Sequence, residues 1–289
     1  MKCQIKGLQQ YLNQPKRSIC IGKFDGFHQG HQALFNQAEF LVTFSPHPET
    51  ILQPSSTVQR LTLDEELRFL TNHRVCFIPF TIELSKLSPF AFLNDIIQPN
   101  FSPQKIVVGY DFRFGHKQSG TNQTLNNWGK MHQCQIVIVK EQLTNHGTPF
   151  KSRQIKSLLR TDFNTAVDYL GHGYPFKGMV IHGDQRGNAL GFPTANIIIP
   201  KNKCCPTFGV YASHTIINET AYKSISYIGQ KPTFNGNQPV LETHILNGFS
   251  SDIYGQDIVV ILDHFIRNER RFSSEQELSE QINQDIQSI

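Results

Sequence analysis

A glycine-rich stretch in the second half of the chain carries residue types suited to a magnesium nucleotide. It occupies residues 183–196 (GDQRGNALGFPTAN) and contains three glycines, Gly183, Gly187 and Gly191. Glycines let a ligand approach bare backbone N–H groups, and Pro193 stiffens the chain before the Thr194 hydroxyl and the Asn196 amide. These oxygens, with few carboxylates nearby, suit a metal that already carries phosphate. The alternative is a Gly/Pro turn between two strands.

A second chemical motif contains two histidines, His28 and His31, within residues 22–31 (GKFDGFHQGH). They flank Gly30, so both imidazoles can face one concave spot above a helix N-terminus, which itself favours phosphate. Imidazoles there can donate hydrogen bonds to a phosphate whose charge grows in a transition state. The alternatives are two surface histidines in a turn, or a zinc site that lacks further ligands within sequence reach.

Two further motifs follow apolar runs of the first half. Residues 43–48 (TFSPHP) predict a rigid wall beside the histidine motif, with a proline-rich strand end as the alternative. Residues 109–115 (GYDFRFG) place aromatic side chains and one arginine at another strand end, which suits a flat ring system. Phe112 and Phe114 could instead belong to the core.

The elements that position these motifs differ between the two halves of the chain. The first half alternates apolar runs at 18–22, 40–44, 75–80, 106–109 and 135–139 with helical stretches at 31–40, 63–71 and 90–97. Such alternation predicts a parallel sheet covered by helices. In such sheets ligands bind at the carboxyl ends of strands, where residues 22–31 and 109–115 lie.

The pattern changes after residues 171–175 (GHGYP). Short β runs follow at 177–182, 209–217, 222–228, 241–246 and 257–265. They predict a small antiparallel barrel. Residues 274–286 predict a final helix, in which Ser274 and Glu277 have capping-box spacing. The fold class is therefore α/β plus β, with domains expected at 1–172 and 173–289.

Composition is that of a globular protein of two domains. The 289 residues are 17% charged and 38% hydrophobic, with a formal net charge of +4. This mild charge fits anionic substrates such as ATP as well as it fits nucleic acid. No apolar run is long enough to span a bilayer, and the N-terminal residues lack the apolar block of a signal peptide. The six cysteines are expected to be reduced thiols, and the protein to be cytoplasmic.

Read together and in order, these motifs resemble the bifunctional riboflavin kinase/FMN adenylyltransferases (FAD synthetases) of bacteria. The likeness covers nearly the whole chain, and although each motif is weak alone, together and in this order they are specific. Residues 22–31, 43–48 and 108–115 are similar to the family's Rossmann-like nucleotidyltransferase domain. The matches to its kinase barrel are residues 183–196, 208–211, 228–234, 241–244, 252–255 and 266–272.

The resemblance implies two reactions and a set of residues for each. ATP would phosphorylate the ribityl hydroxyl of riboflavin with Glu242 as the base, and FMN would then attack the α-phosphate of a second ATP beside His28 and His31. Thr194 and Asn196 would hold Mg²⁺. Nucleotide binding is implied for Gly22, Phe24, Asp25, Gly26, Gly30, Ser152, Lys156, Gly183, Gly187, Gly191, Pro193, Thr194 and Asn196. Flavin binding is implied for Pro46, His47, Asp111, Phe112, Phe114 and Arg267. The expected partners are ATP, riboflavin and FMN, without nucleic acid or membrane.

The first half departs from the family pattern at several places. The segment between His31 and Thr43 is a helical turn or two shorter than is usual. Residues 151–156 (KSRQIK) align with a family segment S-S-[ST]-x-I-R that binds ATP phosphates, and Lys156 lacks the planar donor pair of an arginine. Thr121 stands where the family often has Asn or Asp. Two alternatives stay open: a riboflavin kinase with a degenerate, non-catalytic first domain, and a flavin-sensing regulator that binds nucleic acid.

Overall fold

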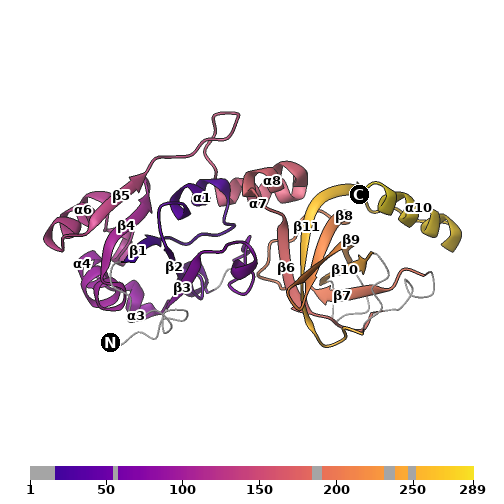
Figure 1. Ribbon diagram of the computed structural model, residues 1–289, viewed down its shortest axis with the longest axis horizontal. Helices are drawn as coiled ribbons and strands as arrows, with labels where there is room; N and C mark the ends of the chain where they lie inside the picture. Colours follow the sequence, from indigo (N-terminus) through magenta and orange to yellow (C-terminus); the bar gives the residue numbers. More distant parts are fainter. Residues whose placement is uncertain (1–16, 55–57, 184–190, 231–237, 247–251) are drawn as a thin grey trace. The chain divides into compact units, whose positions relative to one another are not determined.

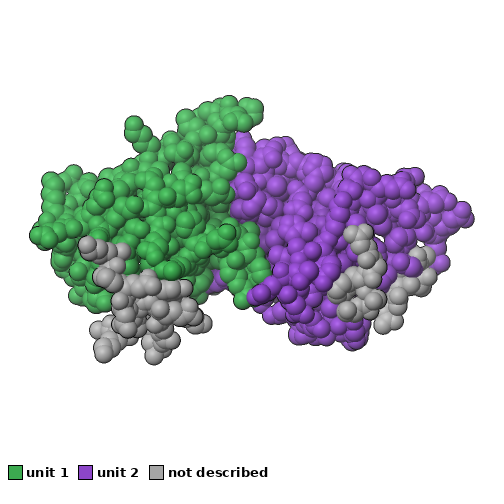
Figure 2. Space-filling model, in the orientation of Figure 1, with its two compact units in different colours: residues 1–58, 67–151 green, residues 59–66, 152–289 purple. Residues whose placement is uncertain are grey.

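The chain forms two compact units. The computed structural model describes residues 17–54, 58–183, 191–230, 238–246 and 252–289. The first unit comprises the residues up to Val58 together with Leu67–Lys151, and the second comprises Gln59–Glu66 with Ser152–Ile289 (Figure 2). The boundary expected between residues 172 and 173 stays a prediction. The contacts group residues 152–172 with the second unit.

A five-stranded parallel sheet forms the first unit, as the sequence predicts (Figure 1). The strands are β1 (Arg17–Ile21), β2 (Phe40–Ser45), β3 (Arg74–Pro79), β4 (Pro103–Gly109) and β5 (Gln135–Val139). Their order is β3-β2-β1-β4-β5. The chain therefore adds β2 and β3 on one side of β1 and then β4 and β5 on the other, which makes a topological switch point between β1 and β4.

The strands of this sheet divide their side chains between two apolar layers. Ile19 and Ile21 of β1 pack in one buried cluster, and Cys20 packs in another on the opposite face. Because successive strand residues point to opposite faces, a sheet covered on both sides reads as continuous apolar sequence. This explains why the short apolar runs predict these strands correctly.

Helices cover the two faces of the parallel sheet. They are α1 (Gln29–Phe35), α2 (Pro48–Leu52), η2 (Leu67–Phe69), α3 (Ile82–Ser85), α4 (Pro89–Ala91), η3 (Phe92–Ile97), α5 (Gln98–Phe101), η4 (His116–Gln118) and α6 (Asn122–Met131). η3 is a π-helix that continues from α4 into α5. Side chains of η3, α5 and α6 belong to one buried cluster, and Leu34 and Phe35 of α1 to the other.

The helix predicted at 63–71 is wrong, because only the short turn η2 forms there. The physical reason lies in Glu66, whose buried carboxylate accepts hydrogen bonds from the Leu63 N–H at 2.7 Å and from Lys203 Nζ at 2.6 Å. These bonds hold residues 59–66 in the second unit, whereas Leu67 packs in the first. A continuous helix would cross that division.

The second unit is a six-stranded antiparallel barrel followed by a helix, again as predicted (Figure 1). Its elements are α7 (Ser152–Thr161), α8 (Phe163–Leu170), β6 (Tyr174–Met179), β7 (Thr194–Ile198), β8 (Gly209–Ile217), β9 (Thr220–Gln230), β10 (Pro239–Ile245), β11 (Asp257–Asn268) and α10 (Glu275–Gln287). The strand order is β6-β11-β8-β9-β10-β7. An isolated bridge between Ile181 and Asn196 joins the two edges of this sheet.

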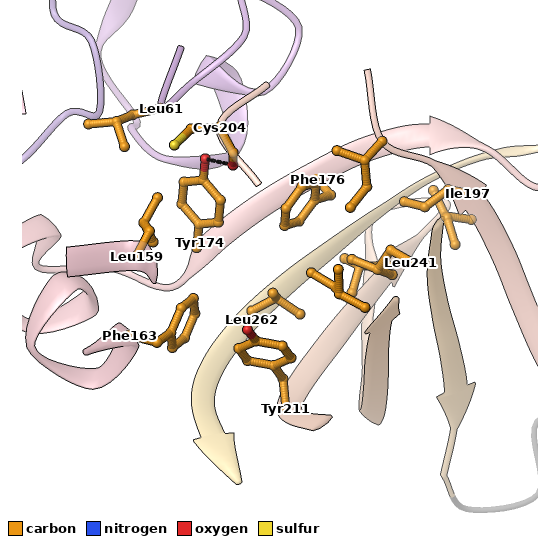
Figure 3. Close-up of a cluster of buried hydrophobic side chains, with 14 of the residues drawn as sticks. Leu61, Leu159, Phe163, Tyr174, Phe176, Ile197, Cys204, Tyr211, Leu241 and Leu262 are labelled. Atoms are coloured by element: carbon orange, nitrogen blue, oxygen red, sulfur yellow. Dashed lines mark hydrogen bonds between the residues drawn. The ribbon is translucent and has the colours of Figure 1, made fainter. Parts of the chain in front are cut away.

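The core of the second unit is apolar and includes helix α7 and residues 59–66 (Figure 3). Tyr174 lies within it, and its hydroxyl donates to the Cys204 carbonyl at 2.6 Å. Lys203 and Glu66 form an ion pair whose side chains are 0% and 1% exposed. Burial raises the pKa of the Glu66 carboxyl, and the Lys203 ammonium opposes that shift. Lys203 also donates to the Leu61 carbonyl at 2.7 Å, so it fastens residues 59–66 to the barrel.

Helix α10 begins at its predicted cap. Ser274 accepts a hydrogen bond from the Glu277 N–H at 3.2 Å, whereas the Glu277 carboxylate binds the Ser273 N–H at 3.0 Å instead of that of Ser274. The Ser274 half of the predicted capping box is therefore present, and the Glu277 half reaches the residue before the cap. Among the helices of the described residues, none has the length and apolar character needed to cross a membrane.

The five cysteines within the described residues are free thiols. Burial raises the pKa of Cys76 and of Cys134 to about 11, and that of Cys205 to about 12. Thiols held protonated in this way are poor nucleophiles.

Candidate functional site

The predicted motifs of the first unit follow the carboxyl ends of three neighbouring strands. Residues 22–31 follow β1, residues 46–48 follow β2 and residues 110–115 follow β4, and these strands are adjacent and parallel. The motifs therefore meet at one edge of the sheet, beside the switch point between β1 and β4, where open α/β sheets bind ligands.

His28 and His31 form a stacked pair at the start of α1. His28 is the N-cap residue, and His31 follows it by three positions on the same side of the helix. Their ring centroids lie 3.7 Å apart with an angle of 17° between the planes, and the Phe150 ring lies 6.5 Å from that of His28. A Cβ on Gly30 would come within 3.1 Å of His28 Nδ1, so the glycine makes room for this stack.

The surroundings of the His31 imidazole favour its neutral form. Burial, with the neighbouring His28 as a smaller cause, holds the pKa of His31 well below its usual range. Its Nδ1 is buried and has no hydrogen-bond partner among the described residues. A neutral imidazole keeps one N–H donor, so His31 can donate to an arriving phosphate oxygen without carrying a buried charge.

The loop before α1 is held by buried aromatic rings. Phe24 and Phe27 have φ angles of 49°, in the left-handed region, and both rings are buried against Phe35. A Cβ on Gly22 would meet the Phe24 ring at 2.5 Å, and Gly26 has a φ of 97°. Phe24, predicted to bind nucleotide, thus has its side chain in the core. The buried Asp25 lies between these rings along the chain.

The flavin residues expected in the first unit have mixed surroundings. His47 caps α2, and its Nδ1 accepts from the Glu49 N–H at 3.3 Å, which places its ring proton on Nε2. Pro46 and Asp111 are exposed. Phe112 and Phe114 stack at 5.2 Å, with Phe114 in the core and Phe112 partly buried against it.

Ser152 and Lys156 lie on α7, grouped with the second unit. Ile155 and Leu159 form the buried side of this helix, and Arg153 is exposed. The first turn of α7 carries no acidic residue. Arg153, which stands where the family has a small hydroxyl residue, therefore lies at the surface without disturbing the core.

In the second unit, one row of side chains runs from strand to strand along one face of the barrel. Glu242 on β10 lies directly opposite Asn196 on β7 and Tyr227 on β9, and the row continues through Val210 to Arg267 on β11. Residues opposite one another in neighbouring strands point to the same face. The predicted base, the predicted metal ligand and the predicted flavin residue Arg267 thus share one face of the sheet. Thr194 lies on the same face, opposite His244.

Asn196 has the features of a metal or phosphate ligand. The residue is 3% exposed, and its Oδ1 is buried and accepts no hydrogen bond from the described residues. A Cβ on Gly183 would lie 2.5 Å from its amide nitrogen, so this glycine leaves the space that Asn196 occupies. A buried acceptor of this kind requires a partner, and together with the Thr194 hydroxyl it fits Mg²⁺ carried by a nucleotide.

Other predicted residues of the glycine-rich stretch flank this ligand. Gly191 has a φ of 85°, and the Pro193 carbonyl oxygen lies 2.8 Å from His244 Nδ1. Gly187 and the segment 231–234 of the family motif lie outside the described residues.

Arg267, at the far end of the row, is held by helix α10. Its Nε and Nη2 donate to the buried Asp285 carboxylate at 2.7–3.0 Å. Near it, the Tyr227 hydroxyl donates to Glu269. Burial, followed by the bond to Glu269, raises the pKa of Tyr227. Tyr227 and Asp285 carry no motif in the sequence, because only strand register and helix packing bring them to the row.

A second feature missed from sequence is a ring pair beside the glycine-rich stretch. His182 and Tyr254 stack with centroids 3.9 Å apart, at an angle of 27°. The Gly255 N–H donates to the Val180 carbonyl at 2.9 Å, which aligns the two segments. Residues 252–255 formed one of the family motifs, but the motif alone does not indicate its neighbour.

Family models match both halves of the chain. The model described as FAD synthetase matches residues 11–154, and the model described as riboflavin kinase matches residues 170–289. The chain is 31% identical to the bifunctional riboflavin kinase/FMN adenylyltransferase of Escherichia coli (strain K12), covering 97% of this chain and 95% of the relative. The protein of the same description from Bacillus subtilis (strain 168) is 32% identical, covering 95% and 92%.

A solved structure has the same fold over nearly the whole chain. It is a crystal structure described as a macrolide-efflux protein from Streptococcus pneumoniae, with a TM-score of 0.80 and 27% identity, covering 97% of this chain and 96% of that one. A shared fold does not by itself imply a shared activity.

Proposed function

The chain belongs to the family of bifunctional riboflavin kinase/FMN adenylyltransferases, and we propose that it converts riboflavin to FMN in the second unit and FMN to FAD in the first. Each reaction uses its own ATP. The observation that carries the kinase assignment is the placement of Glu242 directly opposite Asn196. For the second reaction it is the stacked histidine pair beside the switch point.

In the kinase reaction, the ribityl hydroxyl oxygen of riboflavin attacks the γ-phosphorus of ATP. The bond from that phosphorus to its bridging oxygen breaks, ADP leaves, and Glu242 takes the hydroxyl proton. Asn196 and Thr194 hold the phosphate end of the nucleotide. Mg²⁺ bound to these two residues would neutralise the charge of the transferring phosphate.

The row of side chains gives the two substrates of the kinase their direction. Along the curved barrel wall, Asn196 and Arg267 lie four strand steps apart in the order β7-β10-β9-β8-β11. Glu242 stands one spacing from Asn196. We therefore propose that ATP phosphates lie at the β7 end and that the flavin ring extends towards Arg267.

In the transferase reaction, a phosphate oxygen of FMN attacks the α-phosphorus of ATP, and pyrophosphate leaves. No protein nucleophile and no base are needed, because the attacking phosphate is already anionic. His28 and His31 donate hydrogen bonds to the phosphate oxygens on which charge develops. Ser152 and Lys156, which follow Phe150 closely in the chain, are proposed as further phosphate ligands.

A product assay on the purified protein tests both reactions. With riboflavin and Mg-ATP, chromatography should show FMN first and then FAD, and a chelator should stop FMN formation. FMN without FAD, also when FMN is supplied directly, would establish a kinase with an inactive first unit. The absence of FMN would overturn the kinase assignment.

A further inference from the structure

The interior of the barrel contains a closed ring of five hydroxyl groups. The residues are Ser213 and Thr215 on β8, Ser224 and Ser226 on β9, and Thr243 on β10. In ring order, Thr215 bonds Ser224 at 2.9 Å, Ser224 bonds Ser213 at 2.8 Å and Ser213 bonds Ser226 at 2.8 Å. Ser226 bonds Thr243 at 3.0 Å, and Thr243 returns to Thr215 at 3.2 Å.

Every hydroxyl of this ring is satisfied. The five side chains are between 0% and 4% exposed. Thr215 donates to Ser224, and Ser226 donates to Thr243. When the other three bonds follow the same direction, each hydroxyl donates once and accepts once, which uses its single proton. The ring also joins β8 to β10 across β9, since Thr215 contacts Thr243.

The stability of the barrel alone does not require such a ring, because apolar residues can fill positions of this kind. Replacing both partners of a buried hydrogen bond with apolar groups of the same shape is close to neutral in stability. Phe176 and Leu241 belong to the apolar cluster that fills another part of this unit's interior (Figure 3). A fully satisfied polar network contributes a defined arrangement more than it contributes free energy.

The arrangement that the ring defines is the register of β10. A shift by one residue would turn the buried face of this strand outwards. A shift by two residues keeps the alternation of faces, so apolar patterning opposes it only weakly. The five-bond ring closes in the observed register, in which Thr243 lies opposite Ser226 and Glu242 lies opposite Tyr227 and Asn196.

We propose that this hydroxyl ring is a positioning element for riboflavin phosphorylation, which sets Glu242 beside Asn196 by fixing β10 between β9 and β7. The inference rests on the proposed kinase function. Thr243 and Ser226 are the positioning residues nearest to the reaction, because they adjoin Glu242 and Tyr227 along their strands. Neither side chain reaches the face on which the substrates bind.

The test is the kinetics of Thr243→Val, which keeps the shape of the side chain and removes one hydroxyl. We expect kcat for FMN formation to fall by about 10- to 100-fold, the loss that a misplacement of about 1 Å can cause. KM for ATP should stay within about twofold, because protein molecules whose β10 strand is paired in the native register bind ATP as before. FAD formation from supplied FMN should be unchanged, and Thr243→Ser should restore kcat.

Thr62→Val is the matched control, since Thr62 is 1% exposed in the same unit but lies outside the sheet. It should leave kcat unaltered even if it lowers the melting temperature.

If Thr243→Val fails to fold, the double variant Thr215→Val/Thr243→Val removes two bonded partners together. Hydrogen exchange of the β10 amides should then be faster than in the wild type. A folded variant with wild-type kcat and wild-type exchange would overturn the proposal, whereas a wild type that makes no FMN would overturn the function beneath it.

Discussion

The two units place their candidate catalytic groups by different means. In the parallel unit, His28 and His31 lie in and beside a loop, and covalent spacing of three residues brings their rings together. In the barrel, Glu242 and Asn196 are 46 positions apart in the sequence and meet because two strands pair in one register. A loop site depends on a short stretch of sequence, and a strand site depends on the whole barrel.

The largest effect that tests this difference is expected from Glu242→Gln. The amide keeps the size of the carboxylate and cannot take the hydroxyl proton, so FMN formation should fall by about 10²- to 10⁴-fold. FAD formation from supplied FMN should persist, because it occurs in the other unit. Chromatography of both products measures the two rates, and Glu280→Gln on the exposed side of α10 is the control. Equal loss of both products would contradict two independent sites.

The reciprocal change is His28→Ala. Removal of a hydrogen-bond donor to a charge-developing oxygen costs about 10²- to 10³-fold in rate, so FAD formation should fall by this factor while FMN still accumulates. The exposed His146 in the same unit provides the control His146→Ala. Unchanged FAD formation in His28→Ala would remove the histidines from the mechanism.

The sequence was most informative where neighbouring residues make the structure. The parallel strands follow from short apolar runs, and the stack of His28 and His31 follows from their spacing across Gly30. The barrel was also predicted, from β runs separated by turns. What could not be read from the sequence is the pairing of distant residues: that Glu242 stands opposite Asn196, or that Asp285 holds Arg267.

The failed helix at 63–71 shows the same limit. Its local pattern is helical, yet the carboxylate of Glu66 is drawn to Lys203, 137 positions away. No local propensity contains that interaction.

The roles of Gly187 and of residues 231–234 stay predictions from the family motif, as do those of Ser152 and Lys156.

The Lys203–Glu66 pair predicts a large change in stability confined to the barrel unit. Lys203→Met leaves a buried carboxylate without its charged partner, which costs about 3–5 kcal/mol. The double variant Lys203→Met/Glu66→Leu removes both charges and should recover most of that loss. Urea unfolding measures the free energies, with Lys201→Met as an exposed control. A single variant as stable as the wild type would mean that the pair does not fasten residues 59–66.

A pH effect should distinguish the parallel unit. The pKa of His31 is lowered in the folded state, so below about pH 6.5 the unfolded chain takes up a proton that the folded chain does not. Stability should therefore fall as the pH drops from 7.5 to 5.5. Fluorescence of Trp128, the one tryptophan of the chain, reports unfolding of this unit. In His31→Gln this contribution should be absent, and an unchanged slope would assign it to other groups.

The smallest expected effect concerns Thr121, a departure of the parallel unit from the family pattern. Thr121 is the N-cap of α6: its hydroxyl accepts from the Thr124 N–H, and the Thr124 hydroxyl accepts from the Thr121 N–H, both at 3.3 Å. Asn and Asp serve equally well at this position, so the substitution preserves a cap. Thr121→Ala should cost about 1 kcal/mol of unfolding free energy, and Thr121→Asn about nothing, with FAD formation unchanged in both. If Thr121→Asn instead altered KM for ATP in FAD formation, position 121 would act on the nucleotide, and the loop site would extend beyond the short stretch around its histidines.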